Sequence, residues 1–433
     1  MPSNINAPSL DGLELGQAVV RILTRRLVPF LFLLYIVAYL DRINLGFAAL
    51  QMQKQLDFTD SIYGLGAGIF FAGYFLFQVP SNLVLMRVGV RRWIALLMVT
   101  WGIISASMCM VTGARSFYAL RFLLGAAEAG FFPGVILYFK TWFPARTRAR
   151  TVSRFMSAAP LSGVIGGPLS GALLGLHGKS GMAGWQWMFI LEGLPAVILG
   201  VIAWMYLVDS PADARWLNSD QKSWLQRTLQ QEHIEISQSS GRGGIRVWPI
   251  LVLSLVYFGL NTVSYGVSLW LPTLIKSLSG MSNLAIGILS AVPYVTAAVA
   301  MIAVGLHSDK SGERRWHVAV PAFAGALALS LATHTNSVSV TTALLSVAVL
   351  GVFSMMGPFW AMPTALLSAT AAAVGIAVIN SLGNLGGFFG PYMIGALRHA
   401  TGSFKAGLLV AGGALAISGL LALTLKTESG RQA

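Results

Sequence analysis

The pentapeptide Gly89-Val-Arg-Arg-Trp93 recurs as Gly312-Glu-Arg-Arg-Trp316, 223 residues further along the chain. Each copy stands between two long apolar runs. The same offset aligns Gly167-Pro168 with Gly390-Pro391, again inside corresponding apolar runs. Because self-similarity at a fixed spacing is the signature of a repeated structural unit, the sequence predicts two halves of similar architecture and the same orientation.

The composition indicates a protein embedded in lipid. Of its 433 residues, 55% are hydrophobic and 10% are charged, a balance that is not typical of water-soluble chains. A helix needs roughly 20 apolar residues to cross a hydrocarbon core of about 30 Å. We identify twelve such runs, at 27–50, 61–83, 93–112, 116–139, 152–176, 185–207, 248–273, 283–306, 317–334, 339–366, 370–397 and 404–425.

We therefore predict an all-α integral membrane protein whose twelve transmembrane helices form two six-helix bundles related as a parallel repeat. The predicted division is a tail at 1–26, a first bundle at 27–208, a polar linker at 209–246, a second bundle at 247–425 and a tail at 426–433. Within the linker, Ser219 is expected to begin a short amphipathic helix that carries Trp224. Proteins built this way hold their substrate near mid-membrane, between the halves.

The net charge of +14 is explained by topology rather than by a nucleic-acid partner. The Lys and Arg residues concentrate in alternate loops, for example at 87–92, 140–154 and 310–315. Because loops rich in Lys and Arg stay in the cytoplasm, we predict a multi-pass protein of the inner membrane with both termini cytoplasmic. The basic residues then face the lipid bilayer and the cytoplasm, and no nucleic acid is expected to bind.

Charged residues lie deep inside two predicted spans. Asp41 and Arg42 are in the first span, and Arg121 and Glu128 stand about two helical turns apart in the fourth. A charge at membrane depth costs about 2.5 to 3.5 kcal/mol on insertion scales, so these residues suggest function. We expect all four to converge on one water-accessible chamber between the bundles. The alternative is that they are fixed ion pairs between helices. A fifth charge, Glu192, is expected to reach the membrane interface.

The balance of two acids and two guanidiniums predicts that an anion and a proton are taken up together. Arg42 and Arg121 are candidate substrate-binding residues, because the planar guanidinium fork matches a carboxylate. A bound anion adds negative charge to a low-dielectric cavity and so favours protonation of nearby acids. We therefore predict that Asp41 and Glu128 are the proton-coupling residues.

Neutral side chains of the second half are the remaining candidates for substrate recognition. The predicted spans there carry Asn261, Tyr265, Trp360, Asn380 and Asn384, and they contain no deep charge. We assign these residues to hydroxyl or ring recognition. For the Tyr and Trp residues, helix packing or anchoring at the interface is the alternative.

Two loops are candidates for a cytoplasmic gate. In the loop at 305–315, Asp309 stands near Arg314 and Arg315, and the three can form an ion cluster that holds the inner side shut. The corresponding first-half loop has Arg91 and Arg92 but no acid, so an ion cluster there needs a carboxylate from another segment of the chain. Cytoplasmic topology alone explains the same arginines equally well.

Taken together, these residues resemble the major facilitator superfamily and, within it, the anion:cation symporter family, over residues ~20–425. The most specific motifs are Tyr39-Leu-Asp-Arg-Ile-Asn44, Arg121-Phe-Leu-Leu-Gly-Ala-Ala-Glu128 and Asn380-Ser-Leu-Gly-Asn384. The resemblance implies import of organic anions with protons, and Tyr39, Tyr74 and Asn384 match positions that line the family's substrate cavity. The stretches at 184–193 and 208–214 are most similar to the tartrate-transporter branch.

We therefore expect a secondary active transporter, not an enzyme, that takes up a small organic anion with protons by alternating access. We expect it to act as a monomer without cofactor or metal. A tartrate-like hydroxydicarboxylate or a sugar acid is the first choice of substrate, and an aromatic acid of the phthalate or 4-hydroxyphenylacetate type is the alternative. The six His residues lack the spacing of metal ligands, which disfavours a membrane enzyme. From the sequence alone, a channel or a sensor remains an alternative function.

Overall fold

The computed structural model describes residues 10–239, 247–367 and 369–425, and this part of the chain is built from helices without a strand. The α-helices are α1 (Leu10–Gln55), α2 (Asp60–Val88), α3 (Val90–Ser107), α4 (Ala114–Glu128), α5 (Phe131–Trp142), α6 (Ala145–Met156), α7 (Ala158–Leu173), α8 (Gly184–Tyr206), α9 (Ser219–Ser239), α10 (Val247–Leu278), α11 (Asn283–Ser311), α12 (Arg315–Ala332), α13 (Val338–Leu366), α14 (Ala369–Thr401) and α15 (Lys405–Thr424). Short 3-10 turns lie at Met108–Met110, Leu174–Leu176, Lys179–Gly181 and Pro211–Asp213.

The helices account for twelve membrane spans. Within the described residues, 11 helical stretches are long and apolar enough to cross a membrane, two of which join consecutive helices: α4 with α5 and α6 with α7. Helix α14, which is 33 residues long and contains the predicted span 370–397, completes the set. The predicted all-α fold class is thus confirmed.

Two helices extend the structure beyond the predicted spans. Helix α1 begins at Leu10, well inside the predicted N-terminal tail. Helix α9 begins at Ser219 as expected and runs for 21 residues. The Trp224 ring of α9 lies against Gly16 of α1, and Leu225 beside it is buried. The linker helix therefore packs on the protein through its apolar face.

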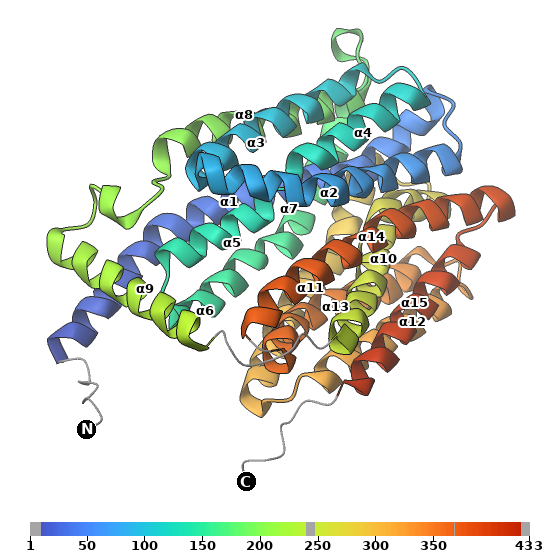
Figure 1. Ribbon diagram of the computed structural model, residues 1–433. Coiled ribbons are helices and arrows are strands. Elements are labelled where there is room, and N and C mark those ends of the chain that lie inside the picture. Colours follow the sequence, from blue (N-terminus) through green and yellow to red (C-terminus); the bar gives the residue numbers. More distant parts are fainter. Residues whose placement is uncertain (1–9, 240–246, 368, 426–433) are drawn as a thin grey trace.

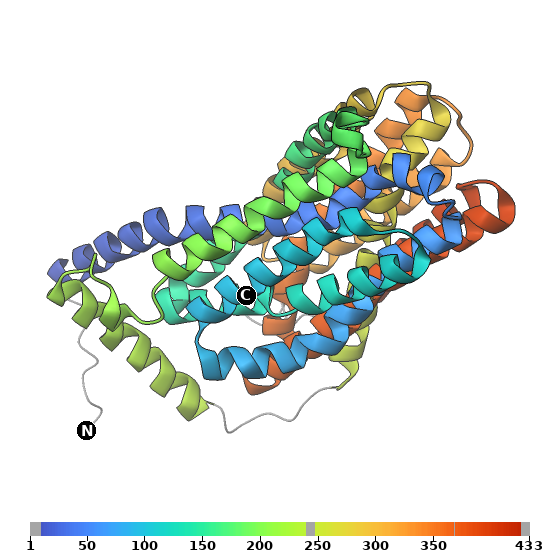
Figure 2. The same ribbon diagram turned by 90° about the horizontal axis from the view of Figure 1, so that it is seen from above.

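The helices gather into two groups, α1–α8 and α10–α15, which are visible as the blue-to-green and the yellow-to-red parts of Figures 1 and 2. They meet most extensively along two seams, α2 against α14 and α7 against α11, and α1 also contacts α10 between them. We call the end of the bundle with α9 the linker end, and the end with the α1–α2 turn at 56–59 the distal end. A Cβ placed on Gly64 would lie 2.7 Å from the carbonyl oxygen of Pro391, and one on Gly287 would meet the carbonyl oxygen of Gly167. Gly64 and Gly287 are 223 residues apart, so equivalent glycines allow close helix contact at both seams near the distal end.

Replacing Gly287 by alanine is expected to lower the thermal stability of the protein. The added methyl group would overlap the Gly167 backbone, which cannot move aside as a flexible side chain could. Overpacking of this kind typically costs 1–3 kcal/mol. Gly413→Ala is the matched control, because nothing lies within 4 Å of the position of its Cβ. Thermal unfolding in detergent measures both variants, and equal midpoints for the two would contradict the tight α7–α11 seam.

Candidate functional site

A cavity lies between the two halves, on the linker side of the glycine contacts, and its empty space of about 590 Å³ includes the part that is open to solvent. Helices α1, α2, α5, α6 and α7 line it from one half and α10, α11, α13 and α14 from the other. The polar lining consists of Arg42, five tyrosines and three asparagines: Tyr35, Tyr39, Tyr74, Tyr257, Tyr265, Asn261, Asn380 and Asn384.

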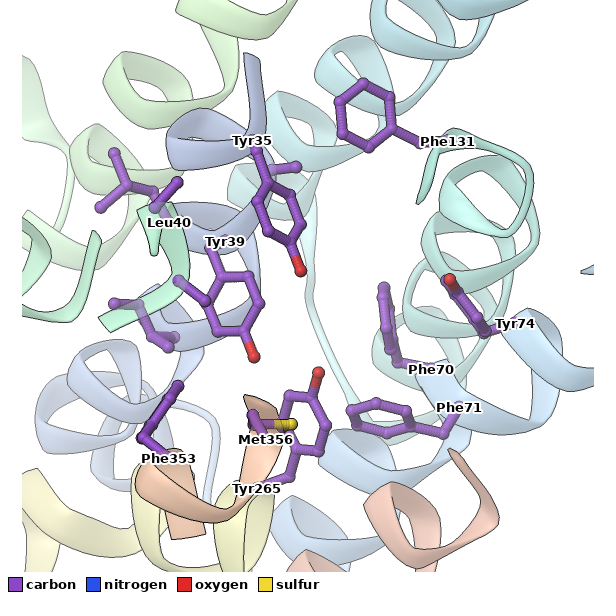
Figure 3. Packing of buried hydrophobic residues seen from close by; sticks show 14 of the residues in the cluster. Tyr35, Tyr39, Leu40, Phe70, Phe71, Tyr74, Phe131, Tyr265, Phe353 and Met356 are labelled. Atoms are coloured by element: carbon purple, nitrogen blue, oxygen red, sulfur yellow. The ribbon is translucent and has the colours of Figure 1, made fainter. Parts of the chain in front are cut away.

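Most of the predicted substrate-binding residues border this cavity. Those that line it are Arg42, Tyr39, Tyr74, Asn261, Tyr265, Trp360 and Asn384, whereas Arg121 does not. Figure 3 shows the hydroxyl groups of Tyr35, Tyr39 and Tyr265 pointing towards one central space. Among the described residues, the structure therefore brings together one cation, several hydroxyl groups and several amides.

Arg42 is held from both sides of the cavity. Its Nε donates to Glu128 Oε2 at 2.8 Å, and its Nη1 donates to the hydroxyl oxygen of Tyr265 at 3.2 Å. The guanidinium carbon lies 5.2 Å from the ring centre of Tyr74 and 5.6 Å from that of Tyr39, within cation–π range. Arg42 is thus a positive charge held in place in the wall of the cavity.

Glu128 is the acidic partner of Arg42 in this ion pair. It is 1% exposed, and its Oε1 has no hydrogen-bond partner among the described residues. A buried carboxylate is stable only while a cation compensates its charge. The protonation of Glu128 and the availability of Arg42 are therefore linked.

Asp41 and Arg121 do not join this pair, so the expected convergence of four charges is wrong for two of them. The side chain of Asp41 accepts a hydrogen bond from Ser105 Oγ of α3 at 2.7 Å. Neighbouring residues on a helix project about 100° apart, so Asp41 and Arg42 face different neighbours. Arg121 donates to the carbonyl oxygens of Gly66 and Ala67 in α2 at 3.3 and 3.4 Å. It shares a face with Glu128 but lies about 10 Å further along α4.

Glu192 lies inside the first bundle rather than at the membrane interface, which corrects the expectation from its place in the sequence. It is 2% exposed and accepts a hydrogen bond from Ser170 Oγ at 2.7 Å. The proline-containing helix α8 continues to Tyr206, so Glu192 is well within the span. It contacts neither the cavity nor a described cation.

The predicted gate residues pair within their own halves. Arg314 Nη1 donates to Asp309 Oδ1 at 2.7 Å, and Arg315 donates to the carbonyl oxygen of Leu425 at 3.2 Å. In the first half, the carboxylate comes from Asp209, which accepts a hydrogen bond from the backbone N–H of Arg91 at 2.8 Å. The Asp209 carboxylate also lies 3.6 Å from Nε of Arg91. Arg92 is exposed. Since none of these pairs links the halves, they do not close the linker end here.

An ion pair that the sequence did not suggest joins the halves at the distal end. Arg398 Nη1 of α14 lies 2.8 Å from Asp60 Oδ1 of α2. The Arg398 guanidinium also lies 4.3 Å from the ring centre of Phe404, and Gln53 donates to the same Asp60 oxygen at 3.2 Å. The distal end is thus closed by charge as well as by glycine contacts.

Some residues that line the cavity were not predicted from the sequence. Tyr35 and Tyr257 stand one helical turn before Tyr39 and Asn261, so helical periodicity from the predicted residues could have found them. Phe132, Met301 and Met356 also line the cavity. These three look like ordinary apolar residues of a span, and no sequence signal separates them from their neighbours.

Comparison with known proteins agrees with this architecture. The model of the Major Facilitator Superfamily matches residues 31–391. The "Putative tartrate transporter" of Agrobacterium vitis is 51% identical over 417 residues, which cover 95% of each chain. The "Quinolone resistance transporter" of Acinetobacter baumannii is 41% identical and covers 92% of each chain.

Comparison with solved structures also agrees with this architecture. A bacterial homologue of the human lysosomal transporter Spinster, solved in an inward-facing and occupied conformation, matches with a TM-score of 0.76 at 17% identity, over 92% of this chain and 95% of that one. This likeness concerns the fold alone. Two bundles that meet around a central cavity, together with the family match along most of the chain, show that this protein is a membrane transporter of the Major Facilitator Superfamily.

Proposed function

We propose that this chain imports a small organic carboxylate together with protons, by alternating access across the inner membrane. The observation that carries the proposal is the buried Arg42–Glu128 pair in the wall of the cavity between the halves. Arg42 is the single charged residue among those that line the cavity in the described chain. The pair is neutral as it stands, so an anion that enters adds a charge that must be compensated.

Protonation of Glu128 provides that compensation. A neutral Glu128 holds the Arg42 fork less strongly, so the fork can then bind a substrate carboxylate through two parallel N–H donors. Each substrate carboxylate needs one proton to restore a net charge of zero at the site, and this favours joint passage of the anion with protons. Asp41, which is buried beside α3, remains our second candidate for a proton-coupling residue.

A hydroxylated acid is our first choice of substrate. The amides of Asn261, Asn380 and Asn384 stand in the second half, opposite Arg42, and can bind hydroxyl groups. The name of the Agrobacterium relative supports a tartrate-like hydroxydicarboxylate. The ring of tyrosines and Trp360 favours an aromatic acid as the second candidate, because flat rings stack on such side chains.

We infer the orientation from the distribution of Lys and Arg, which places the linker end and both termini in the cytoplasm. The cavity then lies on the cytoplasmic side of a closed distal end. Arg91, Arg92, Asp309, Arg314 and Arg315 are proposed to close the cytoplasmic side in the opposite state. One chain supplies both walls of the cavity, so we propose that the monomer is the transporting unit.

Reversing one charge of the distal ion pair is expected to reduce uptake several-fold. In Arg398→Asp a second carboxylate faces Asp60, and the repulsion opposes distal closure. Partly exposed pairs contribute up to about 1 kcal/mol, so the effect should be moderate. The control is the exchanged pair, Asp60→Arg with Arg398→Asp, which should recover most of the uptake. Failure of the exchanged pair to recover would contradict the role of this contact as the distal lock.

Uptake into proteoliposomes tests the proposed function. Labelled tartrate, gluconate, phthalate and 4-hydroxyphenylacetate are supplied outside, with and without an inwardly directed proton gradient. We expect at least one of the four to accumulate above its outside concentration only with the gradient. Uptake that merely equilibrates, whatever the gradient, would indicate a channel and contradict the proposal.

A further inference from the structure

Arg42 and Tyr265 occupy equivalent positions in the two repeats. They are 223 residues apart, the same offset that aligns Gly89 with Gly312 and Gly167 with Gly390. They are also in direct contact, since Arg42 Nη1 donates to the Tyr265 hydroxyl oxygen at 3.2 Å. Equivalent positions of two related halves can touch only next to the axis that relates them. This contact therefore marks the boundary across which the halves must move.

Tyr265 is well placed to hold a fixed position at this boundary. It belongs to α10 in the second half and is 6% exposed. Its ring packs against Phe71 of α2, with 4.3 Å between ring centres. In Figure 3 its hydroxyl group points towards the space that Tyr35 and Tyr39 also face. The ring is thus fixed by packing, and the hydroxyl group is left to contact Arg42.

The Arg42 side chain consequently connects the two halves. Nε binds Glu128 of the first half, whereas Nη1 binds Tyr265 of the second. When Glu128 becomes protonated, the guanidinium loses its charged partner, and the aromatic faces of Tyr39 and Tyr74 hold its position only loosely. A hydrogen bond to a neutral group is weaker than one to a charged group, so the contact with the Tyr265 hydroxyl group then carries a larger share in positioning Arg42.

We propose that Tyr265 is a positioning residue whose hydroxyl group keeps the Arg42 fork at the axis between the halves while Glu128 is protonated, so that the arriving carboxylate meets a preset guanidinium. This inference rests on the proposed function and deepens it. It also changes the role expected for Tyr265, which would act through Arg42 rather than by recognising a substrate hydroxyl group. A preset guanidinium lowers the cost of binding, because less freedom is lost when the substrate arrives.

The test is Tyr265→Phe, which removes the hydroxyl group and keeps the ring on Phe71. Initial rates of uptake in proteoliposomes, with the same four labelled acids, give KM and kcat separately. We expect KM to rise about tenfold with kcat changed much less, as for the loss of one hydrogen bond to a charged group. Tyr294→Phe is the matched control: it is the same chemical change at a buried tyrosine of α11 outside this cavity.

A second comparison separates positioning from general packing. Counterflow exchange is measured for Tyr265→Phe alone and in the Glu128→Gln background, where Arg42 has lost its charged partner. We expect the substitution to raise the KM of exchange by a larger factor in that background, which is a coupling between the two sites. Equal factors in both backgrounds, or an unchanged KM in the single variant, would overturn the inference. If the unaltered protein transports none of the four acids, the proposed function fails, and this inference fails with it.

Discussion

Glu128→Gln is expected to abolish accumulation driven by a proton gradient and to leave counterflow exchange largely intact. Glutamine has nearly the same shape as glutamate, and its side-chain oxygen can still accept the Arg42 Nε–H, which reaches Glu128 Oε2 at 2.8 Å. It cannot take up and release a proton, so the anion no longer has to travel with one. Uptake with a pH gradient and exchange at equal pH, measured on the same vesicles, give the two quantities.

Glu192→Gln is the control for this experiment. Glu192 is an equally buried acid of the same bundle, but it bonds to Ser170 and contacts neither Arg42 nor the cavity. We expect this variant to retain gradient-driven accumulation. If Glu128→Gln reduced accumulation and exchange to the same extent, Glu128 would be needed for binding rather than for coupling.

Arg42→Lys is expected to reduce uptake about a hundredfold although the positive charge is retained. Lysine presents a compact ammonium group and cannot offer the planar fork that spans Glu128 and Tyr265. Hydrogen bonds to charged groups contribute about 1.5–3 kcal/mol each, so the loss of one good bond lowers affinity roughly tenfold to a hundredfold or more. Substrate-induced thermal stabilisation of the purified protein is expected to disappear as well.

Arg121→Lys distinguishes binding from structure. Arg121 is 1% exposed and donates to two carbonyl oxygens of α2, and it does not line the cavity. We expect this variant to unfold at a lower temperature and still to be stabilised by substrate. A substrate-induced shift that survived in Arg42→Lys and vanished in Arg121→Lys would reverse the assignment of the carboxylate-binding arginine.

The sequence predicted the architecture because lipid imposes simple rules on a chain. Apolar runs of sufficient length must be helical in a membrane, and the 223-residue offset showed that the second half repeats the first. Charged side chains are energetically costly at membrane depth, and this cost identified Arg42 and Glu128 as candidates. The two residues meet at the cavity. Neutral residues such as Asn261 and Asn384 were found because they are polar within apolar spans.

The remaining features depend on the rotation and contact of helices, which a single sequence does not specify. Asp41 adjoins Arg42 in the chain, yet it faces α3 rather than the cavity. Asp60 and Arg398 stand at span ends, where charges are ordinary, and only the packing of α2 on α14 brings them together. Asp209 likewise became recognisable as the partner of Arg91 only in the folded chain.

Proton movement evoked by substrate tests the central claim most directly. Proteoliposomes are suspended in a weakly buffered medium without an imposed gradient, an unlabelled acid that accumulated in the uptake assay is added, and the external pH is followed. Our account predicts that the medium becomes more alkaline as anion and proton enter together, and that Glu128→Gln shows no such change. Entry of the same acid, followed with label in a parallel assay, without any alkalinisation in the unaltered protein would contradict it.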